Sequence, residues 1–279
     1  MPSLSLRSSS RSSLGHKKPP VSPRSARLVV LCLGEVLGSA MLMYFGCMSL
    51  VSGFSQAPLP GMQGGLMFGF VVSTIIVIFG HISGAHLNPT VSLSAYLLDM
   101  IPLIELPVYF VSQIVGCLIG VGLLHVVTPQ EILYPLGGSV GFCVTVPHAS
   151  LTQAQAFLAE FLSTSLLIFT CCGVWDPRNA RHGDATPIKF ALVIALCSIT
   201  VGPYTGASMN PARSLAPAVF SQVWTAHWLY WVAPMLASLV STLTYKYLFS
   251  AADSLLAGKS HSTELSEGDV EGSVPMPIN

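Results

Sequence analysis

Charged side chains are scarce in this chain of 279 residues: 9% of the residues are Asp, Glu, Lys or Arg, whereas 52% are hydrophobic. Soluble domains carry about 25% charged residues, because charged groups keep their surfaces hydrated. So few charges exclude an ordinary soluble domain. Several apolar runs also reach about 20 residues, the length at which a helix crosses the hydrocarbon core of a bilayer. We therefore predict an all-α protein that crosses the lipid bilayer several times.

Motifs for catalysis and metal binding are also missing. The seven cysteines form no C-x-x-C pair and have no metal-ligand spacing, so we interpret them as small buried side chains. No nucleophile has a base beside it in a recognisable motif, and no Gly-rich phosphate loop or cluster of metal ligands stands out. These absences argue against an enzyme, a cofactor and a bound metal, and no nucleic-acid partner is expected.

Acidic residues are absent from residues 1–27, which are rich in Ser, Pro and basic residues and lack the apolar stretch of a signal peptide. We predict a disordered tail there, and another over the polar, acidic residues 251–279. Between the tails, six long apolar runs predict transmembrane helices at about 28–50, 62–81, 103–127, 152–174, 187–204 and 228–250. Two further runs, about 88–98 and 210–220, are too short to span and predict half-helices.

Lys and Arg are absent from the predicted loops 51–61 and 128–151. Eleven of the twelve basic residues lie in the N-terminal tail, in or beside the loop between the fourth and fifth spans, or near the C-terminal end. The positive-inside rule then places both termini in the cytoplasm. We expect the plasma membrane as the location. The twelfth basic residue is Arg213, which follows the second Asn-Pro dipeptide.

The two halves of the membrane domain, about 28–127 and 152–250 within residues 28–250, repeat each other. Glu35 begins E-V-L-G-S and Glu160 begins E-F-L-S-T, 125 residues later. Asn88 and Asn210 are 122 residues apart, each within G-A-x-x-N-P. A repeat with three spans must be inverted in the second half. Folds of this kind place their site near the midplane, where broken helices from the two halves meet.

Each Asn-Pro dipeptide predicts the start of a half-helix, because Asn is a leading N-cap residue and Pro fits the first helical position. The irregular backbone before it cannot face lipid, so it must be buried in protein or line a wet cavity. Two inverted half-helices then direct their positive ends at one spot, which opposes cations. The Asn amides offer donors there. The loop carbonyls that offer acceptors are those of Gly84, Ala85, His86, Gly206, Ala207 and Ser208.

NPT at 88–90 and NPA at 210–212, set in an inverted six-span repeat with Arg213 directly after the second motif, resemble the aquaporin (major intrinsic protein) family. The resemblance implies six transmembrane helices, two re-entrant half-helices, a homotetramer with one pore per subunit, and passive conduction of water. Thr90 stands where the family usually has Ala, and we expect it to change the shape of the pore without abolishing it. The implied pore motif is Asn88, Pro89, Thr90, Asn210, Pro211 and Ala212.

The same resemblance implies a selectivity constriction made by Phe68, Ser198, Ala207 and Arg213. Strict water channels usually have His at the position of Ser198, so we expect a wider ring that also passes glycerol and urea. Other positions resemble the water-conducting branch, namely Ser214, Ala218 and the pair Tyr230-Trp231. This combination, residues typical of the water-conducting branch with a small residue in place of the His, is similar to the insect entomoglyceroporins.

Glu35 and Glu160 lie well inside apolar runs. Intramembrane acids are generally paired or functional, and the resemblance implies that these two accept hydrogen bonds from the re-entrant loops. Charges at helix ends or a proton relay are the alternatives. We interpret His81 as a loop-supporting residue in preference to a metal ligand.

Two other function classes remain open from the sequence. An ion-coupled transporter with broken helices would also show inverted repeats, but it needs a carboxylate at its site. An adhesion or signalling member of the fold would conduct little, and Thr90 leaves room for that reading.

Overall fold

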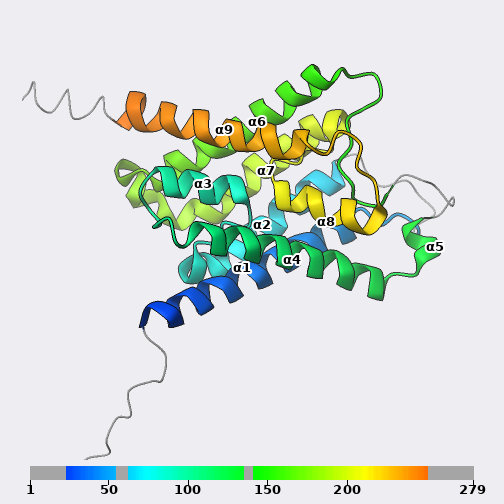
Figure 1. Ribbon diagram of the computed structural model, residues 1–279, viewed down its shortest axis with the longest axis horizontal. Coiled ribbons are helices and arrows are strands. Elements are labelled where there is room, and N and C mark those ends of the chain that lie inside the picture. The colour runs from blue at the N-terminus through cyan, green and yellow to red at the C-terminus, as the bar shows by residue number, and fades with distance from the viewer. Residues whose placement is uncertain (1–22, 55–61, 135–140, 251–279) are drawn as a thin grey trace, which may run out of the picture.

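The computed structural model describes residues 23–54, 62–134 and 141–250, and every regular element in these ranges is helical. The all-α prediction is therefore confirmed. In Figure 1 the start of α1 (Pro23–Met48) and the end of η2 (Tyr245–Ser250) lie on one side of the molecule, and the short α5 (Gln130–Leu133) lies on the other. The predicted disorder of residues 1–22 and 251–279 falls outside the described residues.

Six long helices cross the molecule: α1, α2 (Gln63–Ser83), α4 (Leu106–Val127), α6 (Gln153–Trp175), α7 (Thr186–Thr205) and α9 (Leu229–Thr244). Five of them satisfy the length and hydropathy of a membrane span, α7 together with η1 (Pro177–Ala185) before it. The sixth, α9, has only 16 residues but continues directly into η2. The six predicted spans thus correspond to these helices.

The first helix begins earlier than the sequence indicated. The composition predicts a disordered tail up to residue 27, whereas α1 starts at Pro23. Proline suits the first turn of a helix because its missing N–H needs no partner there. Arg27, in the second turn, pairs with the buried carboxylate of Glu105 at 3.1 Å. This ion pair fastens the polar first turns of α1 to the start of α4.

The interior contains many polar side chains among apolar ones, whereas the exterior of the crossing helices is apolar. Leu33, Leu37 and Phe45 on α1 are about half exposed, while Glu35 on the same helix is fully buried. All six crossing helices carry exposed large apolar side chains. A helix satisfies its backbone hydrogen bonds within itself, and apolar side chains on its outer face are compatible with lipid. This distribution of side chains therefore suits a bilayer.

Glycines allow the helices to pack closely in the absence of a hydrophobic driving force between them. On α4, an added Cβ at Gly116 would lie 2.4 Å from the carbonyl oxygen of Val36, and one at Gly120 would lie 2.3 Å from that of Ala40. These positions are one turn apart on one face of α4. The backbones of α1 and α4 are therefore in direct contact along their crossing.

The two half-helices are α3 (Pro89–Leu97) and α8 (Pro211–Ser221), which extend in opposite directions from the middle of the molecule (Figure 1). Each packs against the last helix of the other repeat as well as within its own: α3 contacts α9, and α8 contacts α4. Three hydrogen bonds join α9 and η2 to α3. They run from Ser238 Oγ to the Thr90 carbonyl (2.7 Å), from Thr242 Oγ1 to Ser94 Oγ (2.8 Å), and from Lys246 Nζ to the Leu97 carbonyl (2.7 Å).

The close crossing of α1 and α4 predicts that Gly120→Ala destabilises the protein by about 1–3 kcal/mol, since the added methyl group meets backbone and not a movable side chain. Gly173→Ala on α6 is the matched control, because nothing lies within 4 Å of its added Cβ. Thermal unfolding of the purified proteins in detergent measures both. Equal midpoints for the two variants would show that the crossing has room.

Candidate functional site

Each spanning helix that precedes a half-helix ends at a glycine in the left-handed region. Gly84 caps α2 with φ 86°, and Gly206 caps α7 with φ 84°. Non-glycine residues with positive φ follow in both loops, at Ala85 and Leu87 and again at Ala207 and Met209. Such residues cost about 1–3 kcal/mol each, so the surroundings must hold them in place.

In the first repeat, the carboxylate of Glu35 holds the loop. Its Oε1 accepts from His86 N at 3.0 Å and its Oε2 from Leu87 N at 2.8 Å. Two side chains also donate to it, Ser83 Oγ at 2.7 Å and Gln113 Nε2 at 2.9 Å. A fully buried carboxylate needs such donors, and here they supply the partners that the irregular backbone lacks.

Glu160 occupies the equivalent position in the second repeat. It accepts from Ser208 N and Met209 N, both at 2.9 Å, and from Thr205 Oγ1 at 2.5 Å. The donors match those of the first repeat residue by residue, but no counterpart of Gln113 donates to Glu160 within the described residues. The predicted contact of both glutamates with the re-entrant loops is present in the structure.

Two tyrosines that the sequence analysis did not single out secure the broken ends of α2 and α7. Tyr109 OH donates to the Ser83 carbonyl at 2.5 Å, and Tyr230 OH donates to the Thr205 carbonyl at 2.7 Å. The two tyrosines are 121 residues apart, close to the offset of the Asn-Pro motifs. Comparing the halves at that offset would have found them.

The loop-supporting position predicted for His81 is not seen. Its side chain is exposed, and no hydrogen bond from it to the loop occurs within the described residues. His81 lies two positions before Ser83 on a helix, so the two side chains point to different faces. Instead, the ring of His86 lies inside, stacked on Tyr109 at 4.4 Å between centroids, with Nδ1 3.2 Å from Ser92 Oγ.

The two asparagines meet where the half-helices begin. Asn88 Oδ1 accepts from Thr90 N, and Asn210 Oδ1 accepts from Ala212 N and Arg213 N, as N-caps do. Each amide nitrogen donates across to the other repeat: Asn88 Nδ2 to the Met209 carbonyl at 2.9 Å, and Asn210 Nδ2 to the Leu87 carbonyl at 2.8 Å. An amide NH₂ has two hydrogens, so each retains one donor.

Thr90, the departure from the family pattern, adds a hydroxyl to this cluster. Its Oγ1 lies 2.8 Å from Asn88 Oδ1 and 3.2 Å from the Met209 carbonyl, and the side chain is fully buried. The hydroxyl therefore bonds to the polar atoms that fix the Asn88 amide. No displacement of the second motif is needed, because Pro211 keeps its place at the start of α8.

A cavity of about 490 Å³ passes both asparagines. Its lining extends from Leu50 and Cys143, near the end of α1, to Trp175 and Thr186, where α6 ends and α7 begins. The six loop residues with predicted pore carbonyls all line it: Gly84, Ala85, His86, Gly206, Ala207 and Ser208. Neither Glu35 nor Glu160 is among the lining residues.

The four residues of the predicted constriction also line this cavity. The Arg213 guanidinium lies 5.2 Å from the centre of the Phe68 ring, within the range of a cation–π contact. Ser198 on α7 lies near Gly65 on α2, whose added Cβ would lie 3.3 Å from Ser198 Cβ and 2.5 Å from Ile199 Cγ1. The small residues Gly65 and Ser198 therefore line this side of the cavity together with Ile199.

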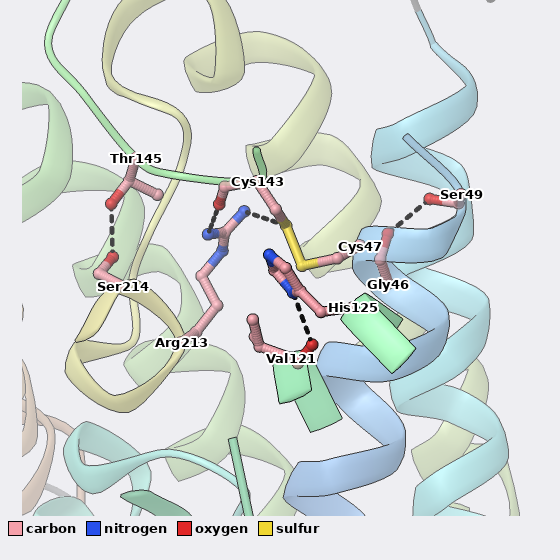
Figure 2. The surroundings of a disulfide bond; sticks show 9 residues. All are labelled: Gly46, Cys47, Ser49, Val121, His125, Cys143, Thr145, Arg213 and Ser214. Atoms are coloured by element: carbon pink, nitrogen blue, oxygen red, sulfur yellow. Dashed lines mark hydrogen bonds between the residues drawn. A yellow bond between two sulfur atoms is a disulfide. The ribbon is translucent and has the colours of Figure 1, made fainter. Parts of the chain in front are cut away.

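Arg213 has an unusual set of partners for a buried cation. Its Nη1 donates to the Cys143 carbonyl at 2.8 Å, and its Nη2 lies 3.9 Å from Cys143 Sγ. No carboxylate lies within ion-pair distance of Arg213 in the part of the chain that the structure describes. Cys143 belongs to the segment 141–150 between α5 and α6, which Figure 2 shows crossing beside Arg213.

Cys143 is also disulfide-bonded to Cys47 on the last turn of α1. The prediction that all seven cysteines are small buried side chains holds for Cys47, whereas Cys143 and Cys32 are only partly buried. The prediction did not include the bond between Cys47 and Cys143. They are 96 residues apart, so their spacing shows no pattern. The topology could have indicated the pair, because the end of the first span and the loop before the fourth must lie at the same membrane face.

An inverted pair of repeats, each with three spanning helices and one half-helix, around a cavity lined by both Asn-Pro motifs, defines an aquaporin-type membrane protein. Comparison with known sequences agrees: the profile described as "Major intrinsic protein" matches residues 23–245. The chain belongs to the major intrinsic protein family, as the paired motifs predicted.

Individual relatives share about a third of the sequence. Aquaporin-4 of Mus musculus is 34% identical over 218 residues, 77% of this chain and 66% of that protein. Aquaporin-8 of Mus musculus is 32% identical over 231 residues, 82% of this chain and 85% of that protein. The chain spans only 55% of Aquaporin-4 of Homo sapiens.

A solved structure supports the fold. The X-ray structure of the aquaglyceroporin from Plasmodium falciparum matches with a TM-score of 0.73 at 24% identity, and the match covers 82% of this chain and 99% of that one. At this identity the similarity shows the shared arrangement of helices alone.

The contacts of Glu160 predict that Glu160→Leu leaves three buried donors unpaired, each at a cost of about 1–3 kcal/mol. Glu160→Gln keeps one acceptor oxygen and should lose less. Yield of monodisperse protein and its unfolding temperature in detergent measure the difference. Glu131→Leu, at an exposed position on α5, is the control. A Glu160→Leu protein as stable as the control would refute the supporting role.

The contacts of Thr90 predict that Thr90→Val, which keeps the branched shape but removes the hydroxyl, lowers stability by about 1 kcal/mol. The unfolding midpoint should then fall by about 2–4 °C for a protein of this size. Thr74→Val is the matched control, because Thr74 is exposed and its hydroxyl bonds only within its own helix. An unchanged midpoint for Thr90→Val would show that the hydroxyl contributes nothing.

Proposed function

We propose that the protein is a passive transmembrane channel for water and for small uncharged solutes such as glycerol and urea, and that it excludes protons and ions. The observation that carries the proposal is the cavity past Asn88 and Asn210. Passive conduction along a pathway with polar groups at intervals involves no chemical step, so we assign the protein no enzymatic activity.

Exclusion of cations follows from the charges around the cavity. The N-termini of α3 and α8 meet at the asparagines, and the positive ends of their dipoles point there. A water at that spot finds one free amide hydrogen on each asparagine, so its oxygen accepts and cannot relay a proton onward. Arg213 adds a full positive charge at one end of the path.

We expect polyols to pass because of the side chains that form the selectivity constriction. Glycerol has a carbon face and a hydroxyl face. Phe68 offers an apolar wall and Arg213 offers donors, while Ser198 and Ala207 leave the remaining sides open. The name of the Plasmodium falciparum relative, aquaglyceroporin, agrees with a fold that admits such solutes.

The two competing function classes have less support. An ion-coupled transporter needs a carboxylate in the pathway, but Glu35 and Glu160 are fully buried behind the loops and bonded to them. An adhesion or signalling protein needs no cavity, and flux measurements separate it from a channel. The exposed apolar helix faces suit contact with lipid. From the resemblance to the family we propose a homotetramer in the plasma membrane, and from the distribution of Lys and Arg we propose that both termini are cytoplasmic.

The width of the ring predicts the effect of Ser198→His. The imidazole should fill the open side, so that glycerol and urea flux fall sharply while most water flux is kept. Stopped-flow measurements on proteoliposomes with water, glycerol and urea gradients, run side by side, test this. Ser198→Ala is the control: it keeps the open side, so its glycerol flux should match that of the wild type.

Two outcomes would contradict the proposal at different levels. If proteoliposomes with the wild-type protein show a water flux above that of empty liposomes but no such glycerol or urea flux, the protein is a water channel that excludes these solutes. If none of the three fluxes exceeds that of empty liposomes, the protein is not a channel for them.

A further inference from the structure

We propose that the Cys47–Cys143 disulfide is a positioning device for Arg213: it holds the backbone carbonyl that keeps the guanidinium against the wall of the pathway. The proposal rests on the proposed channel function and adds Cys47 and Cys143, which affect permeation by positioning Arg213.

Besides the hydrogen bond from Arg213, three contacts from the segment 141–150 to other elements matter here, and we call them anchors (Figure 2 shows the first two). Cys143 is linked to Cys47, Thr145 Oγ1 donates to Ser214 Oγ at 2.7 Å, and His148 N donates to the Tyr204 carbonyl at 2.8 Å. Only the first anchor involves the residue whose carbonyl binds Arg213. The other two fix residues further along the segment, and both connect to the second repeat.

The backbone conformation at Cys143 is intrinsically unfavourable and needs contacts that hold it. Its φ is +61°, in the left-handed region that side chains with a Cβ disfavour. Residues in such conformations persist where their surroundings determine them. The covalent link to α1 and the hydrogen bond from Arg213 both act on this residue, and the carbonyl direction depends on this φ and its neighbours.

Arg213 has few alternatives to this carbonyl. The guanidinium is 8% exposed by residue, and its described partners are the Cys143 carbonyl, the Cys143 sulfur and the ring of Phe68. If the carbonyl turns away, the remaining partner is the face of Phe68, which lines the same pathway. The guanidinium would then lean over the pathway and narrow it.

The last turn of α1 contacts both sides of the constriction. Gly46 leaves room for Phe68, because an added Cβ there would lie 2.5 Å from Phe68 Cε1. Its neighbour Cys47 is covalently joined to the residue that binds Arg213. Helix α1 therefore fixes the distance between the apolar wall and the donor wall through two adjacent residues.

The first experiment counts thiols on the full-length protein. Denaturation in SDS and labelling with a polyethylene glycol maleimide should modify five cysteines before reduction and all seven after it. Seven labels before reduction would mean that the disulfide does not form, which overturns the proposal.

The second experiment measures water flux by stopped flow in proteoliposomes, with and without a phosphine reductant, which donates two electrons to the disulfide and leaves two thiols. If the guanidinium stays at the wall for only about a third of the time, flux falls about threefold. We expect this fall for the wild type and for Cys32→Ala, a free-cysteine control on α1. The double variant Cys47→Ala/Cys143→Ala should show the lower flux with and without reductant.

The third experiment separates positioning from general stability. In an Arg213→Val background, reduction should leave the flux unchanged, because the group that the tether positions is gone. An equal fall in both backgrounds would show that the disulfide supports the fold and does not act through Arg213. Arg213→Ala, which likewise removes every donor at this position, takes its place if Arg213→Val does not reconstitute.

Hydrogen exchange gives a readout that does not depend on conduction. Reduction should speed amide exchange in residues 141–144 and leave that in α6 unchanged. Unchanged exchange in residues 141–144 would overturn the proposal whatever the flux. A wild type with no water flux in either redox state would instead count against the channel function, whereas flux that reduction does not alter would count against the tether alone.

Discussion

Two buried carboxylates hold the irregular backbone on which the rest of the molecule depends. The loops before the half-helices contain residues with positive φ and peptide N–H groups that no helix satisfies. In lipid such a segment would cost several kcal/mol for each unpaired group. Glu35 and Glu160 each bind two successive N–H groups and the side chain at the end of the broken helix. This lets the chain turn back at mid-membrane.

The inverted symmetry is close at the centre and broken towards the ends. The asparagines exchange hydrogen bonds reciprocally, and the tyrosines Tyr109 and Tyr230 repeat the same contact. At the offset of the motifs, however, the position that matches Arg213 is occupied by Val91, which also lines the cavity. One half of the pathway is therefore charged where the other is apolar, and selection by charge is concentrated at a single end.

Much of the fold followed from the sequence because its determinants are local. Run lengths separate the spanning helices from α3 and α8, and the Asn-Pro dipeptides mark where those half-helices begin. The repeat offset also brought out the two glutamates. What the sequence did not show depends on pairing between distant elements: the disulfide of Cys47, the tyrosine contacts, and the exposed side of α2 on which His81 lies. Local patterns contain no information on which partner a side chain meets across a helix interface.

Each half-helix packs against the last helix of the other repeat. This packing has a consequence for the order in which the parts of the protein are synthesised. The carbonyl of Thr90 accepts its hydrogen bond from Ser238, 148 residues later in the chain. When the first half leaves the ribosome, its half-helix has a neighbour in α4 but not yet in α9. Membrane insertion of the early helices therefore precedes completion of the pathway, and the last helix to be synthesised closes a wall that the first half began. Until then the carbonyls of Leu87 and Thr90 lack the side chains of Asn210 and Ser238 that later donate to them, although Glu35 already binds the N–H groups of the same loop.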